Sequence, residues 1–365
     1  MAKLPQCPSL PELTKTDYGI GLVGLGGVAN WGHMPAYRKY GFTVVAVADV
    51  RAEARERAQS FWGVPRVYER YEDLLEDPRV QIVDLTLHHS PARQVVKPGG
   101  SGYARLDVVR DAVAAGKLGL LVDKPMADTY ERAKAMVEAT RGSRMKLAVN
   151  QNGRWGPAHF VARQLIQSGY VGEVDTVLID CTFPMRFSDI VVQMTVHHFD
   201  VMRWWIGLDV KATRVYCSFR QPEQAFSTVA GIVDFVGGKR GVVWDNGAGL
   251  SEAQRLSPTS DQWHRFRIEG SEGTIKGSHQ WNLMMPKDGV EVLSKQGPEA
   301  WLRPMLTAQF PEAGFRGSMG ELMQAITEDR EPLNSGEDNL TTLQLVFGAL
   351  TSAAEQRAVD PSELG

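Results

Sequence analysis

Three polar clusters have residue types and spacing that suit chemistry on a small polar ligand. The first is Asp123-Lys124-Pro125, at the end of an apolar strand expected over residues 118–123. Proline has no amide hydrogen and ends the strand, so Lys124 should lie at the carboxyl end of a parallel sheet, where such sheets bind ligands. A partly desolvated lysine can donate to a hydroxyl or carbonyl and assist a neighbouring proton donor. Lys124 is therefore a catalytic candidate, and the alternative is a solvated lysine at a strand end.

The second cluster opens a helix expected near residues 196–206. His197 and Asp200 are three residues apart, so they share a helix face. A neutral imidazole can take a proton from a hydroxyl while hydride leaves the same carbon, which makes His197 a second catalytic candidate. Asp200 could fix the His197 tautomer or hold a substrate hydroxyl, and Gln193 is a further candidate substrate contact. We assign His198 to packing and expect no metal centre, because Asp200 and Gln193 make a weak ligand set beside the paired histidines.

The third cluster covers residues 150–155, Asn-Gln-Asn-Gly-Arg-Trp. Amides and a guanidinium beside an indole suit polyhydroxylated or anionic ligands, because they supply directional donors and a ring that stacks on sugar C–H faces. Asn152, Arg154 and Trp155 are therefore candidate substrate contacts. The competing interpretation is a capped turn between domains.

A glycine-rich loop near the start of the chain indicates which cofactor would act together with these clusters. A strand expected over residues 18–23 runs into Gly24-Leu25-Gly26-Gly27-Val28-Ala29, and a second strand, residues 42–49, ends on Asp49. The first glycine permits a tight turn, the second lets the backbone approach a pyrophosphate, and a small third residue lets the next helix pack closely. The phosphates would bind at the helix N-terminus. The candidate cofactor-binding residues are Gly24, Gly26, Gly27, Val28, Ala29, Asp49, Arg51 and Lys124.

Asp49 favours NAD over NADP. Its carboxylate could accept hydrogen bonds from the adenosine ribose and would repel a 2′-phosphate. Arg51 could contact a phosphate instead, so NADP is the less favoured alternative.

Composition excludes several other classes of partner. The net charge of −3 provides no positive field for nucleic acid or an anionic membrane, and no run of about twenty apolar residues could span a bilayer. The three cysteines are far apart and outside any Cys/His motif, so we expect neither disulfides nor structural zinc but reduced thiols in the cytoplasm.

The pattern of elements predicts an α/β protein of two domains behind a flexible leader, residues 1–17. Strands near 18–23, 42–49, 80–87, 118–123 and 145–150 alternate with helices near 51–62, 105–115 and 128–141, which predicts a Rossmann doubly wound parallel sheet over residues 18–149. Residues 97–102 interrupt the pattern as either a mobile flap or a surface insertion. From residue 150 to 365 longer strands and glycine turns at 237–238 and 270–273 predict a substrate-binding and oligomerisation domain with an open, mostly antiparallel sheet. Its closing helix, near 338–356, should pack back across the domains, and its open face favours a homodimer or homotetramer.

Taken together, these motifs resemble the glucose-fructose oxidoreductase/inositol dehydrogenase (Gfo/Idh/MocA) family over nearly the whole chain. The residues that carry the resemblance are Gly24 to Ala29, Asp123-Lys124-Pro125 in place of the family's usual Glu-Lys-Pro, His197 to Asp200 as its His-x-x-Asp helix start, and Phe266 to Gly273 as its Gly-x-x-Gly hairpin. The resemblance implies a Rossmann domain followed by an open mixed sheet, a nicotinamide cofactor and reversible oxidation of sugar or cyclitol hydroxyls. It also implies that Lys124 and His197 are the catalytic pair and Asp200 a substrate ligand.

One departure from the family pattern leaves more than one activity open. Inositol dehydrogenase-like members often carry an aspartate four residues before the histidine, where this chain has Gln193. An amide cannot orient an imidazolium by charge, so the proton relay must differ. The leading expectation is an NAD-dependent oxidoreductase acting on a sugar, sugar acid or cyclitol. The alternatives are an NAD-dependent glycoside hydrolase that oxidises, eliminates and re-reduces with tightly bound NAD, and a non-catalytic dinucleotide sensor.

Overall fold

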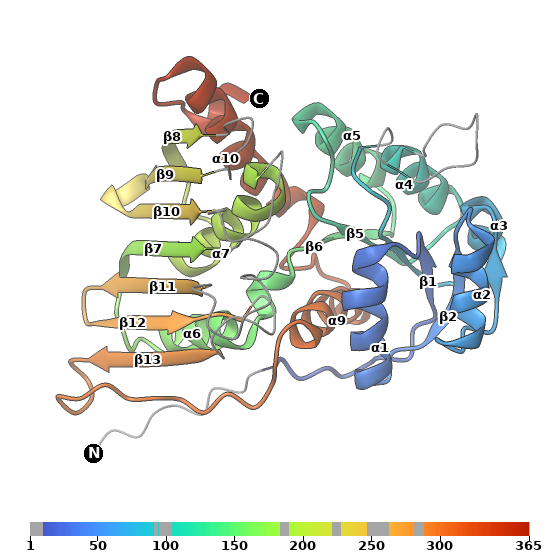
Figure 1. The fold of residues 1–365 in the computed structure, drawn as a ribbon, viewed down its shortest axis with the longest axis horizontal. Helices are drawn as coiled ribbons and strands as arrows, with labels where there is room; N and C mark the ends of the chain where they lie inside the picture. Colours follow the sequence, from blue (N-terminus) through green and yellow to red (C-terminus); the bar gives the residue numbers. More distant parts are fainter. Residues whose placement is uncertain are drawn as a thin grey trace, which may run out of the picture. The chain divides into compact units, whose positions relative to one another are not determined.

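The chain divides into two compact units. In this computed structural model, residues 10–90, 94, 104–182, 190–220, 228–246, 263–280 and 288–364 are described (Figure 1). One unit comprises residues 12–152 and 314–340, and the other comprises residues 153–313 and the chain from residue 341 onward. The loop expected at 97–102 lies outside the described residues.

The first unit is built on a six-stranded parallel sheet in the order β3-β2-β1-β4-β5-β6. Its strands are β1 (Ile20–Val23), β2 (Val44–Ala48), β3 (Val67–Tyr68), β4 (Ile82–Leu85), β5 (Gly119–Asp123) and β6 (Lys146–Asn150). Its helices are η1 (Ala29–His33), α1 (Met34–Tyr40), α2 (Ala52–Ser60), α3 (Tyr71–Glu76), α4 (Arg105–Ala114), α5 (Tyr130–Thr140) and α9 (Glu312–Glu328). This is the doubly wound Rossmann sheet that the sequence predicts, with β3, α3 and α9 in addition to the expected elements.

Helix α9 joins this unit from the far end of the sequence. Its buried Phe315, Met319 and Leu322 belong to the same apolar cluster as Ile20 and Leu121 of the sheet. The approach is close, since a Cβ on Gly119 would come within 2.7 Å of the Ile326 side chain. The helix is thus held by the apolar side chains of the parallel sheet. Residues 314–340 belong to this first unit, whereas the sequence predicted that all of 150–365 would form the second domain.

The second unit is built on a seven-stranded mixed sheet in the order β13-β12-β11-β7-β10-β9-β8. Its strands are β7 (Val174–Thr182), β8 (Ala212–Arg220), β9 (Thr228–Phe235), β10 (Arg240–Asn246), β11 (Trp263–Gly270), β12 (Gly273–Ser278) and β13 (Gly289–Ser294). Its helical segments are η3 (Asn152–Trp155), α6 (Pro157–Gln167), η4 (Val191–Thr195), α7 (Val196–Ile206), η5 (Val236–Gly238), α10 (Gly336–Glu355) and η6 (Pro361–Leu364). Among the pairings of the described strands of this second sheet, only β7–β10 is parallel, so the expected open, mostly antiparallel sheet is confirmed.

One face of this sheet is covered by α6 and α7, which lie along it in Figure 1. Strand residues alternate between this buried face and an open one, as the two-residue period of a strand requires. Packing under α7 is tight, because a Cβ on Gly241 would lie 2.0 Å from the Met202 sulfur. Gly237 and Gly238 adopt φ near +80° in the turn between β9 and β10, which confirms the hairpin expected there.

Among the described residues, no helix combines the length and apolar character that crossing a membrane requires.

Candidate functional site

The glycine loop after β1 has the shape that a dinucleotide pyrophosphate needs. Gly24 has φ +92°, and a Cβ there would lie 2.8 Å from the Leu87 side chain, so the turn requires glycine. A Cβ on Gly26 or Gly27 would meet no atom within 4 Å, so the space beside these two residues is open. Ala29 is fully buried in the cluster between β1, β2 and α2. The loop therefore offers backbone amides and room for an anion at the start of a helical segment, which fits NAD.

Asp49 fastens this loop to the end of β2. Its carboxylate accepts hydrogen bonds from the Leu25 amide (2.7 Å) and from the Arg51 amide (2.9 Å) and Nε (3.0 Å). Burial acts to raise the pKa of Asp49, but the hydrogen bonds from Arg51 and Leu25 outweigh it and hold that pKa below its usual value. Asp49 is thus a fixed negative charge beside the loop, and Arg51 is bound to it rather than directed elsewhere.

Asn30 is a residue of this loop that the motif did not single out. Its side-chain amide donates to the carbonyls of Leu25 (3.1 Å) and Gly26 (2.9 Å), and its side-chain oxygen accepts from Trp62 Nε1 at 2.9 Å. These bonds tie two carbonyls of the loop to the Asn30 side chain. An asparagine directly after a glycine loop was the available sequence signal.

Lys124 follows the last residue of β5 and is half-buried. The peptide bond between Lys124 and Pro125 is cis. The backbone around Lys124 is held by Arg105, whose guanidinium donates to the carbonyls of Asp123, of Pro125 (2.6 Å) and of Met126 (3.2 Å). The same side chain donates to the carbonyl of Leu87, just beyond the end of β4 (3.0 Å). Burial lowers the pKa of Arg105 to about 10, so the group still carries its charge near neutral pH. Sequence reasoning missed this residue because its partners lie 18 to 21 positions away.

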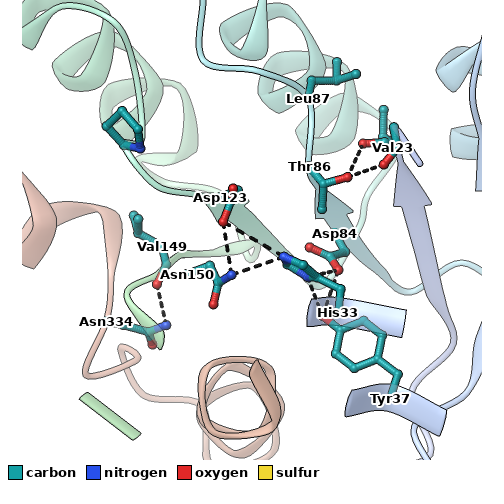
Figure 2. A network of polar contacts seen from close by, with 12 residues as sticks. Val23, His33, Tyr37, Asp84, Thr86, Leu87, Asp123, Val149, Asn150 and Asn334 are labelled. Carbon is teal, nitrogen blue, oxygen red and sulfur yellow. Dashed lines mark hydrogen bonds and ion pairs between the residues drawn. The ribbon is translucent and has the colours of Figure 1, made fainter. Parts of the chain in front are cut away.

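A buried polar network lies behind Asp123 (Figure 2). His33 Nδ1 is 2.7 Å from Asp84 Oδ2, and the Tyr37 hydroxyl donates to the same oxygen at 2.8 Å. On its other side, His33 Nε2 is 3.2 Å from the Asn150 side-chain nitrogen, which donates to Asp123 Oδ1 at 3.1 Å. Burial acts to lower the pKa of His33, yet the Asp84 and Asp123 carboxylates raise it above its usual value. The network therefore links the residue before Lys124 to the centre of the sheet, through side chains that the sequence analysis did not connect.

Helix α7 presents His197 and Asp200 in its first turn. His197 is 5% exposed, and Gln193 lies half-buried in the preceding turn η4. Asp200 is fully buried and receives the Arg154 guanidinium through Nε and Nη2, both at 2.6 Å, and the Thr342 hydroxyl at 3.0 Å. The sequence analysis treated Asp200 and Arg154 as two separate substrate contacts, whereas the structure binds them to each other.

The remaining candidate residues are buried. Asn152 is 6% exposed and Trp155 is 2% exposed. The structure therefore brings together Asp49, Arg51 and the glycine loop in the first unit, and Arg154 with Asp200 in the second. Lys124 belongs to the first unit and His197 to the second.

A Rossmann sheet with an open glycine loop, followed by an open mixed sheet, defines the class of two-unit oxidoreductases that bind NAD. Residues 18–151 match the family model described as "oxidoreductase family, NAD-binding Rossmann fold", and residues 188–360 match the model of its C-terminal α/β domain. The chain belongs to the Gfo/Idh/MocA family.

Curated relatives and solved structures agree with this assignment. The chain is 26% identical over 270 residues to inositol 2-dehydrogenase from Rhizobium meliloti, covering 69% of this chain and 76% of the relative. It is 26% identical over 361 residues to D-apiose dehydrogenase from Paraburkholderia graminis, covering 94% and 89%. Levoglucosan dehydrogenase in complex with NADH and levoglucosan has a similar fold, with a TM-score of 0.75, 18% identity and coverage of 94% and 99%. An oxidoreductase from Agrobacterium radiobacter in complex with NAD+, L-tartaric acid and magnesium has a TM-score of 0.76, 21% identity and coverage of 96% and 100%.

Proposed function

We propose that this protein is an NAD-dependent dehydrogenase of a sugar, sugar acid or cyclitol. The observation that carries the proposal is the position of the half-buried Lys124 at the carboxyl end of the parallel sheet. Arg105 fixes the backbone around Lys124, and the same sheet also carries the open glycine loop. The relatives named above act on a cyclitol and on sugars, which supports the same substrate class. They give no support to the glycoside hydrolase alternative.

The proposed chemistry divides the proton and the hydride between separate groups. Bound NAD supplies the hydride acceptor. Lys124 donates a hydrogen bond to the reacting hydroxyl oxygen and stabilises the negative charge that grows there. His197 accepts the hydroxyl proton at an imidazole nitrogen and returns it in the reverse direction.

We assign the other candidate residues to binding and positioning. Gln193, Asn152 and Trp155 are proposed substrate contacts, because amides and an indole suit a polyhydroxylated ligand. Asp200 and Arg154, bound to each other, hold the first turn of α7 and so position His197.

A panel of sugars, sugar acids and cyclitols incubated with NAD or NADP tests the proposal. Absorbance of the reduced nicotinamide should rise in stoichiometric amounts with at least one polyol. A panel that gives no reduction with either cofactor, in either direction, would count against the proposed function.

Asp49→Ala should change the choice between cofactors. We expect the Kd for NAD to rise about 10- to 100-fold as hydrogen bonds worth about 1.5–3 kcal/mol are lost. The discrimination against NADP should fall as well, because the negative charge is gone and Arg51 is released from it. Fluorescence titration with both reduced cofactors measures this, and Asp73→Ala, exposed on α3, is the matched control. An unchanged ratio of affinities would remove Asp49 from cofactor selection.

We also propose that the protein forms a homodimer or homotetramer through the open face of the second sheet. That face carries large apolar side chains, including Tyr216 (48% exposed), Ile232 (41%) and Trp244 (47%) on adjacent strands. Such a patch favours self-association. Light scattering should give a mass that is two or four times 40.3 kDa, and a monomer mass would contradict the proposal.

A further inference from the structure

A row of metal-ligating residues crosses the helix-covered face of the second sheet. Asp245 on β10 and His264 on β11 are both in direct register with Cys181 on β7, which lies between them. His279 extends the row, because its amide donates to the His264 carbonyl at 3.0 Å. Residues in register point to the same side of a sheet, and each of these four is at most 1% exposed. A face that is otherwise mainly apolar thus places a carboxylate, a thiol and two imidazoles side by side.

The covering helices add two more imidazoles. His198 of α7 has its Nδ1 at 2.7 Å from Asp245 Oδ1, and its ring stacks on His264 with centroids 4.9 Å apart. His159 of α6 has its ring 4.1 Å from that of His279 and 5.1 Å from that of His264. The packing role that the sequence predicts for His198 therefore accounts for its burial but not for its carboxylate partner.

The charges in this cluster favour a bound cation. A buried carboxylate is costly unless a cation or hydrogen bonds compensate it. In the part of the chain that the structure describes, Asp245 accepts a hydrogen bond from the Thr195 hydroxyl at 2.5 Å and lies against His198.

We propose that Cys181, His198 and Asp245 bind a divalent transition-metal ion of the zinc type, with His264 or water in the fourth position. The three ligand atoms already lie within 4.8 Å of one another, on β7, α7 and β10. Tetrahedral bonds of about 2.0–2.3 Å place ligand atoms roughly 3.5 Å apart. The 2.7 Å contact between His198 Nδ1 and Asp245 Oδ1 would therefore open slightly as the ion binds. Thiolate with imidazole selects zinc over magnesium or calcium, which prefer oxygen ligands alone.

The ion would fix the helix turn that carries His197. His198 is adjacent to His197, so a metal held by two strands and His198 would anchor the start of α7 to the sheet. This inference does not rest on the proposed function. It departs from the sequence expectation of no metal, because its ligands come from positions 181, 198 and 245 and form no sequence motif.

Metal content and cobalt spectra of the full-length protein test the proposal. The protein is stripped with a chelator, given one equivalent of Zn²⁺ or Co²⁺ and separated from free metal by size exclusion. We expect about one ion per chain by elemental analysis, and a near-ultraviolet thiolate-to-cobalt absorption band.

Variants locate the site. Cys181→Ser should abolish the cobalt–thiolate band, and Asp245→Asn should weaken zinc binding by at least 10-fold. Cys217→Ser is the matched control, since Cys217 is also a buried free cysteine of this sheet, on β8, and is not among the proposed ligands. If Cys181→Ser does not fold, the cobalt–thiolate band of the parent protein and the weaker zinc binding of Asp245→Asn test the proposal instead. It is then overturned if the band is absent or if Asp245→Asn binds zinc as tightly as the parent. The proposal is overturned if no ion survives size exclusion, or if Cys181→Ser and Cys217→Ser bind metal equally.

Discussion

Lys124→Ala and His197→Ala should each lower kcat by about 10²- to 10⁴-fold, the range typical of a lost proton-transfer or charge-stabilising group. Lys124 is proposed to stabilise negative charge on the reacting oxygen, and His197 is proposed to accept its proton. Water that enters the space left by either side chain would not be held in position to do the same. The Kd for NAD should change little in His197→Ala, and both variants should remain folded. Steady-state kinetics with a substrate found in the panel measures the effect.

The matched control for the lysine is Lys134→Ala on α5, an exposed lysine of the same unit. It should retain the parent kcat. Wild-type turnover in Lys124→Ala or in His197→Ala would remove that residue from the chemical step, whereas loss of the folded state would be seen separately by circular dichroism.

Asp200→Ala should cost about 3–5 kcal/mol in the free energy of unfolding of the second unit. The change leaves the Arg154 guanidinium, which is fully buried, without the carboxylate that accepts two of its hydrogen bonds at 2.6 Å. Removing one partner of a buried pair is costly because the other charge stays in a medium of low polarity. Urea unfolding monitored by tryptophan fluorescence measures the loss.

Two further variants separate charge burial from a simple loss of contacts. The double variant Arg154→Met/Asp200→Leu should recover most of the lost stability, since replacing both partners by apolar groups is often nearly neutral. Asp234→Ala is the surface control: this carboxylate binds Arg214 and Arg240, whose side chains are 60% and 53% exposed, and its loss should cost about 1 kcal/mol or less. An Asp200→Ala cost no larger than that of Asp234→Ala would contradict the buried-pair interpretation.

The sequence predicts those parts of the fold whose signals are local. Apolar runs placed the strands of the first sheet other than β3 to within a few residues, and the loop from Gly24 to Ala29 identified the Rossmann unit. In the second sheet, glycine turns marked the β9–β10 and β11–β12 hairpins. Strand β3 has only two residues, too few to produce an alternating pattern. The sequence predicted neither helix α9 nor its place in the first unit. That place depends on the sheet residues that the apolar face of α9 packs against, and those residues are far away in the sequence.

The candidate site was predictable only where its residues are close in sequence. Asp49 and Lys124 were chosen as candidates from their positions at strand ends. The support around them was not, because Arg105 reaches the carbonyls near Lys124 from the start of another helix, and His33 meets Asp84 across 51 residues. The Arg154–Asp200 pair and the row through Cys181 likewise depend on packing and strand register, which hydrophobic patterns do not specify.

Isotope transfer tests the central claim most directly. The reactive polyol is supplied with deuterium on its carbinol carbons, and the reduced nicotinamide is isolated and weighed by mass spectrometry. Direct hydride transfer predicts one deuterium per reduced cofactor and a lower rate with the deuterated polyol. Lys134→Ala should reduce NAD at the parent rate, whereas Lys124→Ala should reduce it much more slowly. Reduced cofactor without deuterium, or turnover of the polyol with no reduced cofactor at all, would contradict direct hydride transfer from a sugar or cyclitol carbon to NAD.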